Sequence, residues 1–256
     1  MTNMEEHFSA IADKYNAIRT TDREPIEHIR DLFSNYEHCT AVDVGCGPGR
    51  YALLLLQMMP QLHLTCIDRS SDMVAETTRL LRGANIDRFK AILADATDLP
   101  LEANSIDVVL TFNAIHHFPV SAFLREAQEV LKKRGTLAIY TRLRSQNENS
   151  IWGRYFPDFN TVEQRLRSLE SIEALIRATP GLVLDTIKLF QFDRVSSMEG
   201  LIEKARAGHY STFKLYKKER FEECLSEFRV NLMRNFADMN QIRWTDGNAF
   251  LILKAC

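Results

Sequence analysis

The sequence predicts an α/β domain whose core is a doubly wound, mostly parallel sheet. Between residues 40 and 142, short runs of apolar, β-favouring residues alternate regularly with stretches of helical spacing. The short runs are apolar on both sides of the chain, as in strands that are buried on both faces. The 256 residues suffice for one such domain with an elaboration.

Five strands and three helices are expected in this region. The strands are predicted at 41–44, 63–67, 90–93, 106–111 and 135–140, and the helices at about 49–59, 71–83 and 119–133. Cations at 132–134 would favour the negative end of the third helix dipole, and Gly135 would end that helix.

Two flanking regions complete the expected organisation. Apolar residues at helical spacing between 5 and 35 predict two helices with a break near 20–25, and we assign residues 1–36 to an N-terminal helical segment. This segment is either a packing layer over the sheet or a flap that covers a ligand.

Residues 37–256 would form the main domain, with late strands at 182–192 and 249–254 completing the same sheet. A polar loop is expected at 145–149, and helices at about 161–178 and over most of 197–237. Elaborations at about 145–160 and 195–237 would then shape a helical substrate pocket.

Composition excludes several classes of function. The net charge of −2 gives no global attraction to nucleic acid or to an anionic membrane, and no apolar run approaches the roughly 20 residues of a membrane span. The polar, acidic start lacks the features of a secretory signal. Five scattered cysteines without a CxxC pair predict neither disulfides nor zinc. We expect a cytoplasmic protein with no membrane, nucleic-acid or metal partner.

The most informative stretch is a glycine loop directly after the strand at 41–44. Gly45, Gly47 and Gly49 permit a tight turn and let a ligand approach the backbone closely. The helix that starts behind them presents unpaired N–H groups to a carboxylate or phosphate. A nucleotide-like cofactor is therefore expected, and the alternative is a strand–helix turn with no ligand.

Two residues narrow the identity of this cofactor. Loops that bind dinucleotides place a third glycine where this chain has Arg50. Asp43, two residues before the first glycine, can accept from loop amides or from an amino group. S-adenosylmethionine carries such an amino group and nicotinamide dinucleotides do not.

Acidic residues also end the next two strands. Asp68 follows Gly47 by about 20 residues, the position from which a carboxylate reaches ribose hydroxyls, although it could instead cap the following helix. Asp95 is placed to accept from an adenine amine and Ala96 to donate a backbone N–H, unless both belong to a plain loop. Met73 either packs on the adenine or belongs to the core.

The fourth strand ends in Asn113, which is followed by the adjacent histidines His116 and His117. A histidine can act as a general base near neutral pH, while packing is the alternative role for each. No further spacing of histidine, cysteine or aspartate supports a metal site here.

Together these stretches resemble the class I S-adenosylmethionine-dependent methyltransferases, in particular their small-molecule, methyltransferase type 11-like branch. The resemblance rests on residues 42–49, 67–68, 94–100 and 112–118. In addition, the segment at 8–16 resembles the one that precedes this domain in ubiquinone-type and biotin-pathway methyltransferases. It is close over residues 8–142 and faint beyond them.

The resemblance implies a Rossmann-like seven-stranded sheet of order 3-2-1-4-5-7-6 with the last strand antiparallel. It also implies S-adenosylmethionine as cofactor, S-adenosylhomocysteine as product, and a role for each motif. The three glycines and Asn113 would lie near the methionine moiety, Asp68 at the ribose, Asp95 and Ala96 at the adenine, and Tyr15 near the cofactor.

The chain lacks the motifs of several other methyltransferase families, and this narrows the range of acceptors that it could methylate. Residues 113–116 do not form the Asn/Asp-Pro-Pro-aromatic motif of enzymes that methylate amino groups on adenine or glutamine. The chain has no Pro-Cys pair for methylation at cytosine C5, and its cysteines do not form the cluster expected of arsenite methyltransferases.

The region after residue 142 is expected to select the substrate. Arginines and aromatic residues interleave there, and a bidentate arginine would suit an acidic acceptor. The candidate contacts are Arg144, Arg154, Tyr155, His209 and Tyr210. The alternative is solvated helix faces with core aromatics between them.

Four functions therefore stay open. The first is methyl transfer to a small molecule, possibly an acidic or aromatic metabolite, and the second is methyl transfer to tRNA or to a carrier-bound acyl chain. The third is cofactor binding without catalysis, and the last is a nicotinamide dehydrogenase. Both a monomer and a homodimer are compatible with the sequence.

Overall fold

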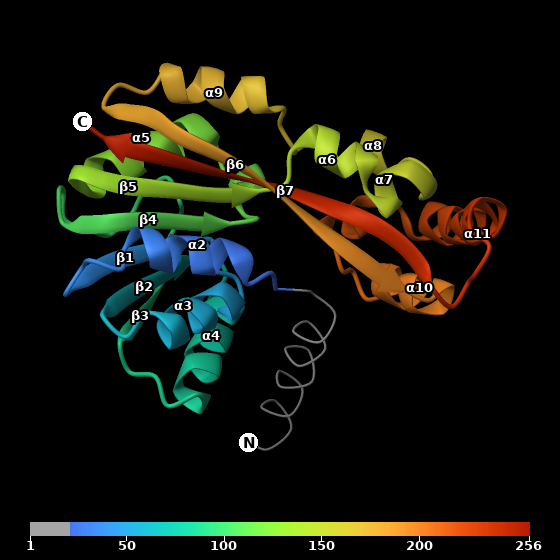
Figure 1. Ribbon diagram of the computed structural model, residues 1–256, viewed down its shortest axis with the longest axis horizontal. Helices are drawn as coiled ribbons and strands as arrows, with labels where there is room; N and C mark the ends of the chain where they lie inside the picture. Colours follow the sequence, from blue (N-terminus) through green and yellow to red (C-terminus); the bar gives the residue numbers. More distant parts are fainter. Residues whose placement is uncertain (1–20) are drawn as a thin grey trace. The chain divides into compact units, whose positions relative to one another are not determined.

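The computed structural model describes residues 21–256, which fall into two compact units (Figure 1). The sheet unit contains 21–141, 169–188 and 249–256, and the helical unit contains 142–168 and 189–248. Tyr15 and the first of the two N-terminal helices expected from the sequence lie outside the described residues. The proposed boundary at residue 36 stays a prediction.

A seven-stranded sheet has the strand order β3-β2-β1-β4-β5-β7-β6 (Figure 1). Its strands are β1 (Cys39–Val44), β2 (Leu62–Asp68), β3 (Phe89–Leu93), β4 (Ile106–Phe112), β5 (Leu131–Thr141), β6 (Leu182–Ser196) and β7 (Ile242–Ala255). Strands β1 to β5 pair in parallel, and β7 runs antiparallel to β5. The predicted order and the predicted antiparallel strand are confirmed.

Burial explains why the central strands are so apolar in sequence. Val42 of β1, Val109 of β4 and Leu137 of β5 are fully buried, and each stands at the middle of its strand. Parallel neighbours must be joined by crossovers, and helices supply most of them. Consequently apolar side chains are needed on both faces of these strands.

Five described α-helices belong to the sheet unit. They are α2 (Glu24–Leu32), α3 (Arg50–Met58), α4 (Ser71–Gly83), α5 (Val120–Val130) and α9 (Leu169–Arg177). Helix α3 packs against α2 and α4, while α5 packs against α9. None of the helices found between residues 21 and 256 is long and apolar enough to cross a membrane.

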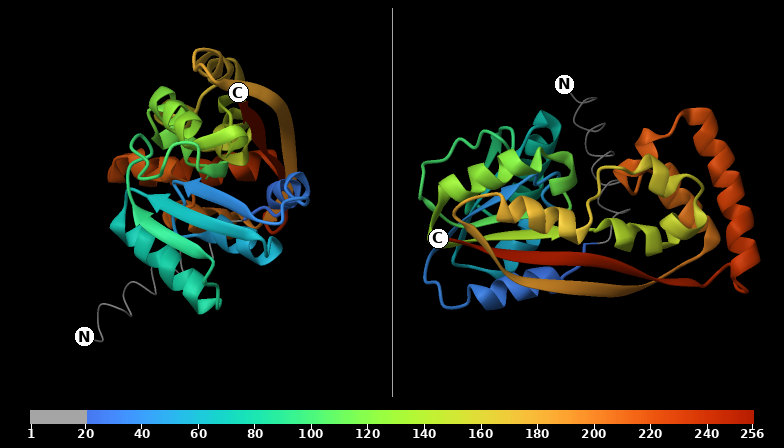
Figure 2. Two further views of the ribbon diagram at one scale, coloured as in Figure 1. Left: turned by 90° about the vertical axis from the view of Figure 1, so that its left-hand side faces the viewer. Right: turned by 90° about the horizontal axis from the view of Figure 1, so that it is seen from above.

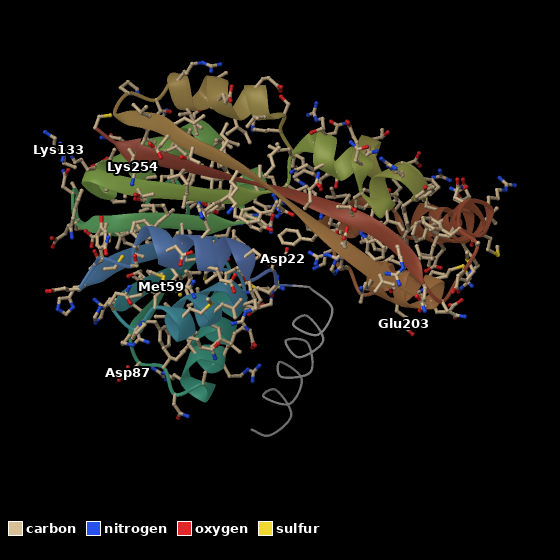
Figure 3. All side chains as sticks on the ribbon, viewed as in Figure 1. Asp22, Met59, Asp87, Lys133, Glu203 and Lys254 are labelled. Atoms are coloured by element: carbon tan, nitrogen blue, oxygen red, sulfur yellow. The ribbon has the colours of Figure 1, made fainter. Side chains whose placement is uncertain are left out.

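The predicted end of the third crossover helix was wrong. Helix α5 ends at Val130, and residues 132–134 belong to β5 rather than to the helix. Leu131 pairs with Ile106 of β4, so strand pairing outweighs the favourable charge–dipole interaction of the cations. Lys133 is exposed (Figure 3), and Arg134 takes a left-handed φ of 64° in the bend before Gly135.

The helical unit has its own apolar core around Trp152. Its helices are α6 (Arg144–Asn149), α7 (Ile151–Tyr155), α8 (Phe159–Val162), α10 (Met198–Arg206), the 3-10 helix η2 (Ser211–Leu215) and α11 (Lys218–Asn235). Figure 2 shows α11 as a long helix of this unit. The Trp152 ring, 1% exposed, stacks on Phe228 at 5.3 Å and meets Phe213 edge-on at 5.1 Å. Packing in this core is therefore enough to explain why aromatic residues interleave with arginines after residue 142.

Two further predictions failed in this region. Residues 145–149, expected as a polar loop, lie in α6, where the Gln146 side chain accepts from the Leu143 N–H and satisfies a donor at the helix start. The expected helix at 161–178 is replaced by α8 and α9, because Glu163 leaves helical geometry and bonds Arg165 and Thr212 instead.

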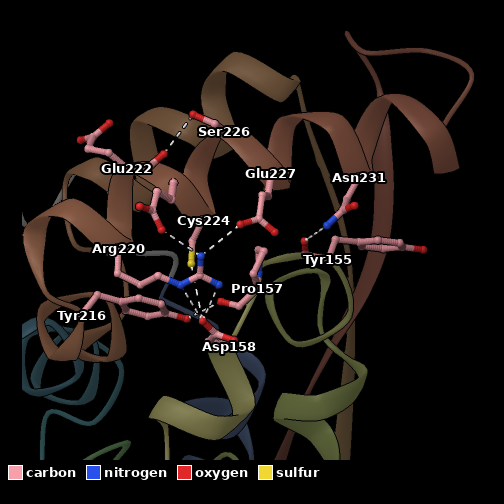
Figure 4. A network of polar contacts seen from close by, with 11 residues as sticks. Tyr155, Pro157, Asp158, Tyr216, Arg220, Glu222, Cys224, Ser226, Glu227 and Asn231 are labelled. Carbon is pink, nitrogen blue, oxygen red and sulfur yellow. Dashed lines mark hydrogen bonds and ion pairs between the residues drawn. The ribbon is translucent and has the colours of Figure 1, made fainter.

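A network of polar contacts ties α11 to the segment that precedes α8 (Figure 4). The Arg220 guanidinium pairs with Asp158 at 2.7 Å and with Glu223 and Glu227 at 3.1 Å. The Tyr216 hydroxyl donates to the Pro157 carbonyl at 2.8 Å. These groups are largely exposed, so we regard the network as a modest contribution to stability.

In the sheet unit, Arg88 holds the turn between α3 and β2. Its guanidinium donates to the carbonyls of Leu56 at 2.8 Å, Pro60 at 2.9 Å and Leu62 at 2.9 Å, with a longer bond to Met59 at 3.2 Å. The last carbonyls of a helix have no partner within the helix, and Arg88 supplies one. One side chain therefore fixes the exit of α3 and the start of β2.

Replacing Arg88 with methionine should lower the free energy of unfolding by roughly 2 kcal/mol, because several carbonyls, most of them partly buried, lose a charged donor. Denaturant unfolding of the Arg88→Met variant would measure this. Lys90→Met, at an exposed position two residues along the chain, is the matched control and should change stability little. Equal stability of the two variants would contradict the role given to Arg88.

Candidate functional site

The candidate site is built on the turn that joins β1 to α3. Gly45, Gly47 and Gly49 have φ values of 75°, 55° and 82°, all in the left-handed region that favours glycine. The N–H groups of Gly45 and Cys46 donate to the Ile67 carbonyl at 2.8 and 3.0 Å, so the turn is bonded to the end of β2.

The space around the three glycines differs. A Cβ atom at Gly45 would lie 2.6 Å from the Ala114 Cβ, and one at Gly49 would lie 3.0 Å from the Thr77 side chain. At Gly47 no described heavy atom lies within 4 Å of such a Cβ. Gly45 and Gly49 are therefore required by packing, whereas Gly47 leaves its backbone open to an approaching ligand.

Asp68 connects this loop to the C-terminal end of β2. Its Oδ2 accepts from the Gly47 N–H at 2.9 Å, and its Oδ1 accepts from the Ser70 N–H at 3.0 Å. Each carboxylate oxygen has a second lone pair, so both bonds leave acceptor capacity. Asp68 is partly exposed and holds the loop while it can still accept from a ligand hydroxyl.

Thr77 of α4 supports the loop from the other side. Its hydroxyl donates to the Gly47 carbonyl at 2.7 Å and lies 3.7 Å from the Cys46 Sγ. Thr77 is fully buried. Both polar groups of the Gly47 peptide unit are thus bonded, the N–H by Asp68 and the carbonyl by Thr77. Sequence reasoning missed Thr77, since nothing in its helical context marks it.

Asp43 lies buried beneath the loop, with 1% of its surface exposed. Within the described residues neither carboxylate oxygen has a hydrogen-bond partner. Burial, and to a smaller extent the nearby charge of Asp68, raises the Asp43 pKa to about 8. A carboxyl group in these surroundings is held neutral near pH 7.

The end of β3 comes next to Asp68. The Ala94 N–H donates to the Asp68 carbonyl at 3.1 Å, which brings Asp95 and Ala96 to the same edge of the sheet. The Asp95 Oδ1 accepts from the Thr97 N–H at 2.9 Å and hydroxyl at 2.7 Å, and these bonds lower the Asp95 pKa. Asp95 is exposed and charged, and Ala96 is buried.

The end of β4 reaches the loop through Ala114. Asn113 has a left-handed φ of 52°, and its N–H donates to the Tyr140 carbonyl at 2.7 Å. The 3-10 helix η1 (Ile115–His117) follows, with the rings of His116 and His117 4.1 Å apart. Three strand ends and the glycine loop therefore meet at one edge of the sheet.

Met73 stands in the first turn of α4, four residues before Thr77 and so on the same helix face. It is partly exposed. This position agrees with a contact near the loop, and the contact itself stays a prediction. Tyr15 lies outside the described residues.

In the helical unit the predicted substrate residues do not form one group. Arg144 bonds the backbone of the 166–167 segment, and Arg154 donates to the Asn149 side chain at 3.0 Å. The Tyr155 ring meets Phe236 edge-on at 5.3 Å. His209 and Tyr210 lie together, with their ring centroids 4.5 Å apart.

A charged cluster gathers beside Tyr210, and sequence reasoning missed most of it. Arg142 pairs with Asp246 at 3.3 Å, and Arg194 lies 3.7 Å from the other oxygen of Asp246. The Arg142 guanidinium sits 4.7 Å above the Tyr210 ring. Lys204 completes the group, which we call the Asp246 cluster (Arg142, Arg194, Lys204, Tyr210 and Asp246).

Metal ligands do not gather in the described part of the chain. Between residues 21 and 256, no group of three or more histidine, cysteine, aspartate or glutamate side chains is arranged to hold a metal ion. The five cysteines, all in this range, are free thiols.

Residues 41–135 match a family model described as a methyltransferase domain. The chain is 27% identical over 176 residues to tRNA (carboxymethyluridine(34)-5-O)-methyltransferase of Macaca fascicularis, which covers 67% of this chain and 24% of that protein. It is 35% identical over 112 residues to phthiotriol/phenolphthiotriol dimycocerosates methyltransferase 1 of Mycobacterium ulcerans, covering 43% of this chain and 40% of the relative. The chain thus spans less than half the length of either relative.

Among solved structures, the YcgJ protein of Bacillus subtilis superimposes with a TM-score of 0.66. The match covers 91% of this chain and 98% of that protein at 16% identity. At this identity the likeness establishes the fold.

The buried Asp43 should make stability depend on pH in a defined window. Because its folded pKa of about 8 lies above the unfolded value near 4, the unfolded chain loses a proton that the folded chain keeps. The free energy of unfolding should therefore fall, relative to an Asp43→Asn variant, as the pH rises from about 4 to about 8. Denaturant unfolding of both ligand-free proteins at pH 5, 6.5 and 8 would measure this.

A constant difference between the two proteins over this range would contradict the neutral state of Asp43. Asp107→Asn is the control. Burial opposes ionisation of Asp107, but hydrogen bonds from Lys132 and Thr40 outweigh it and lower its pKa. Its stability difference should change only below about pH 4.

Thr77→Val keeps the shape of the side chain and removes the donor to the Gly47 carbonyl. We expect S-adenosylhomocysteine to bind roughly fivefold to tenfold more weakly, which corresponds to the free energy of about one hydrogen bond. Calorimetry would measure the affinity. Thr78→Val is the control, because among the described residues that hydroxyl bonds only within its own helix, to the Val74 carbonyl. Unchanged affinity in Thr77→Val would show that the loop does not depend on this bond.

Proposed function

We propose that this chain is a class I S-adenosylmethionine-dependent methyltransferase, which transfers the methyl group of S-adenosylmethionine to a small-molecule acceptor. The match of residues 41–135 to a methyltransferase domain supports this proposal. The acceptor we favour is an acidic or aromatic metabolite. We further propose that the protein works in the cytoplasm, since its cysteines are free thiols.

The main observation in support of the proposal is the environment of Gly47. Its left-handed backbone has open space where a side chain would stand, and its N–H is held by the carboxylate that ends β2. Ligands of doubly wound sheets bind beyond the carboxyl ends of the strands, and an acidic residue at this position binds ribose hydroxyls. The arrangement suits an adenosine ribose beside Asp68.

The other cofactor contacts that we propose follow from the same edge of the sheet. Gly45, Gly47, Gly49, Asn113 and Asp43 would surround the methionine moiety, Asp95, Ala96 and Met73 the adenine, and Tyr15 would approach from the N-terminal segment. Asp43 is a buried acceptor that has no hydrogen-bond partner among the described residues. A cationic amino group near it would favour its ionised form.

The chemistry assigned to the cofactor is an in-line displacement at the methyl carbon of a sulfonium ion, whose thioether leaves without an acid. The chain's own contribution is then to hold the acceptor in line, which can supply several kcal/mol. A base is required only if the acceptor must lose a proton. We propose His116 or His117 for that role, since both stand at the end of β4 beside the loop.

A macromolecular acceptor is the second candidate. The relative from Macaca fascicularis is named for a tRNA uridine and matches 67% of this chain. The net charge of −2 argues against nucleic acid as a partner. Incubation with a labelled methyl donor and separate pools of metabolites, RNA and proteins would decide between the candidates, and we expect the label in the metabolite pool.

Asp68→Ala tests the cofactor assignment directly. Loss of the carboxylate removes both the ribose acceptor and the partner of the Gly47 N–H, so we expect at least about tenfold weaker binding of S-adenosylhomocysteine. Calorimetry would measure the affinity, and the melting temperature would show that the variant is folded.

Asp87→Ala is the matched control, because Asp87 is an exposed aspartate of the same unit. Its affinity should equal that of the unaltered protein. An Asp68→Ala variant that binds as tightly as the control would remove the ribose assignment.

A further inference from the structure

We propose that binding of the cofactor is coupled to the release of a proton from the buried Asp43 carboxyl group, so that the affinity for the cofactor rises with pH across the neutral range. The inference rests on the proposed function for the identity of the ligand, and it adds a pH-dependent control of the same site. In the coupled step the O–H bond of the Asp43 carboxyl group breaks and its proton passes to solvent, while the cofactor itself is unchanged.

Asp43 lies between two strands at the base of the glycine loop. It is the second-last residue of β1, two positions before Gly45. In the sheet it stands opposite Cys66 of β2 and Leu110 of β4. It therefore stands where β1 ends and the loop begins, at the edge where ligands of doubly wound sheets bind.

The Asp43 carboxyl group is enclosed and has no hydrogen-bond partner in the described part of the chain. Only 1% of the residue is exposed, and neither carboxylate oxygen accepts a hydrogen bond from residues 21–256. An ionised carboxylate in such surroundings costs much more free energy than a neutral carboxyl group. In the ligand-free protein the group is therefore neutral near pH 7, in agreement with the Asp43 pKa of about 8, which burial raises more than Asp68 does.

The groups on the neighbouring strand β2 do not favour ionisation of Asp43. Asp68, at the end of β2, is the charged side chain of the described residues that acts on Asp43, and it raises the Asp43 pKa. Cys66 also faces Asp43, but a hydrogen bond with Cys46 and burial raise the Cys66 pKa well above its usual value, so the thiol is uncharged.

The other elements around Asp43 bring no compensating charge. Arg50 begins α3, and His116 and His117 follow β4, but none of these three groups contributes to the shift in the Asp43 pKa. Asp107 of β4 belongs to the opposite end of that strand. Since residues 21–256 supply no cation to Asp43, we infer that a bound ligand supplies it.

A cation at the loop would reverse the effect of Asp68. The Asp68 carboxylate bonds the Gly47 and Ser70 N–H groups, and it raises the Asp43 pKa without a hydrogen bond to Asp43. Charge thus acts across this poorly solvated region without direct contact. Amides of the loop and of the start of α3 would hold the carboxylate of the methionine moiety, so that its ammonium group is left to act on Asp43 with the opposite sign.

Calorimetric titration of the ligand-free, full-length protein with S-adenosylhomocysteine counts the released protons directly. Titrations at pH 6.5 are repeated in two buffers of different ionisation enthalpy, and the difference in heat gives the number of protons released. We expect roughly one proton for each bound ligand, because Asp43 is neutral before binding and ionised after it.

The affinity should change with pH in the corresponding direction. Between pH 6 and 7 the free protein holds the proton and the complex has lost it, so S-adenosylhomocysteine should bind roughly fivefold to tenfold more tightly at pH 7 than at pH 6. Above about pH 8, the Asp43 pKa of the free protein, the affinity should level off because Asp43 is then ionised with or without ligand.

Asp43→Asn identifies the group that loses the proton. The amide keeps the shape of the neutral carboxyl group but cannot ionise, so this variant should release no proton and lose the pH dependence. Asp107→Asn is the matched control, because Asp107 pairs with Lys132 at 2.8 Å and is already ionised in the free protein. It should release a proton as the unaltered protein does. Melting temperatures show whether Asp43→Asn is folded, and Asp43→Ser replaces it if it is not.

The possible results separate this inference from the proposed function. Equal proton release by Asp43→Asn and by the unaltered protein would overturn the inference, because another group such as His116 or His117 would then be the source. Binding of S-adenosylhomocysteine without proton release would also overturn it and would leave the proposed function standing. Failure to bind S-adenosylhomocysteine at any pH from 6 to 8 would overturn both.

Discussion

The hydrogen bond from the Gly47 N–H to the Asp68 carboxylate is the interaction on which the candidate site depends. It joins Gly47 to the end of β2, and Thr77 holds the carbonyl of the same residue. Of the three loop glycines, Gly47 is the one at which no described heavy atom lies within 4 Å of where a Cβ would stand. The loop is thus fixed at the point where a ligand would touch the backbone. The buried Asp43 beneath it is a destabilising feature that the fold retains, which is typical of a functional position.

Much of the fold could be predicted because parallel strands buried on both faces leave an unmistakable pattern. The fully buried Val42 and Val109 stand in such runs. The end of α5 could not be predicted, because the cations at 132–134 favour a helix locally while Leu131 pairs with Ile106, 25 residues away. Similarly, α6 depends on a contact between Leu143 and Gln146 that composition does not reveal.

The glycine loop could be predicted from the sequence and most of the Asp246 cluster could not, for the same reason. The glycine loop and Asp68 are recognisable because their spacing follows directly from one strand, one turn and one helix. Asp246 and Arg194 are 52 residues apart in sequence and meet only because β6 and β7 place them together. Arg142 is a member of the cluster, whereas Arg144 and Arg154 have local partners.

The central claim is that the loop at 45–49 binds S-adenosylmethionine rather than a dinucleotide. Calorimetric titration of the unaltered protein with S-adenosylhomocysteine and, separately, with NAD tests it most directly. We expect one-site binding of S-adenosylhomocysteine and no detectable heat with NAD. Binding of NAD, or failure to bind S-adenosylhomocysteine, would contradict it.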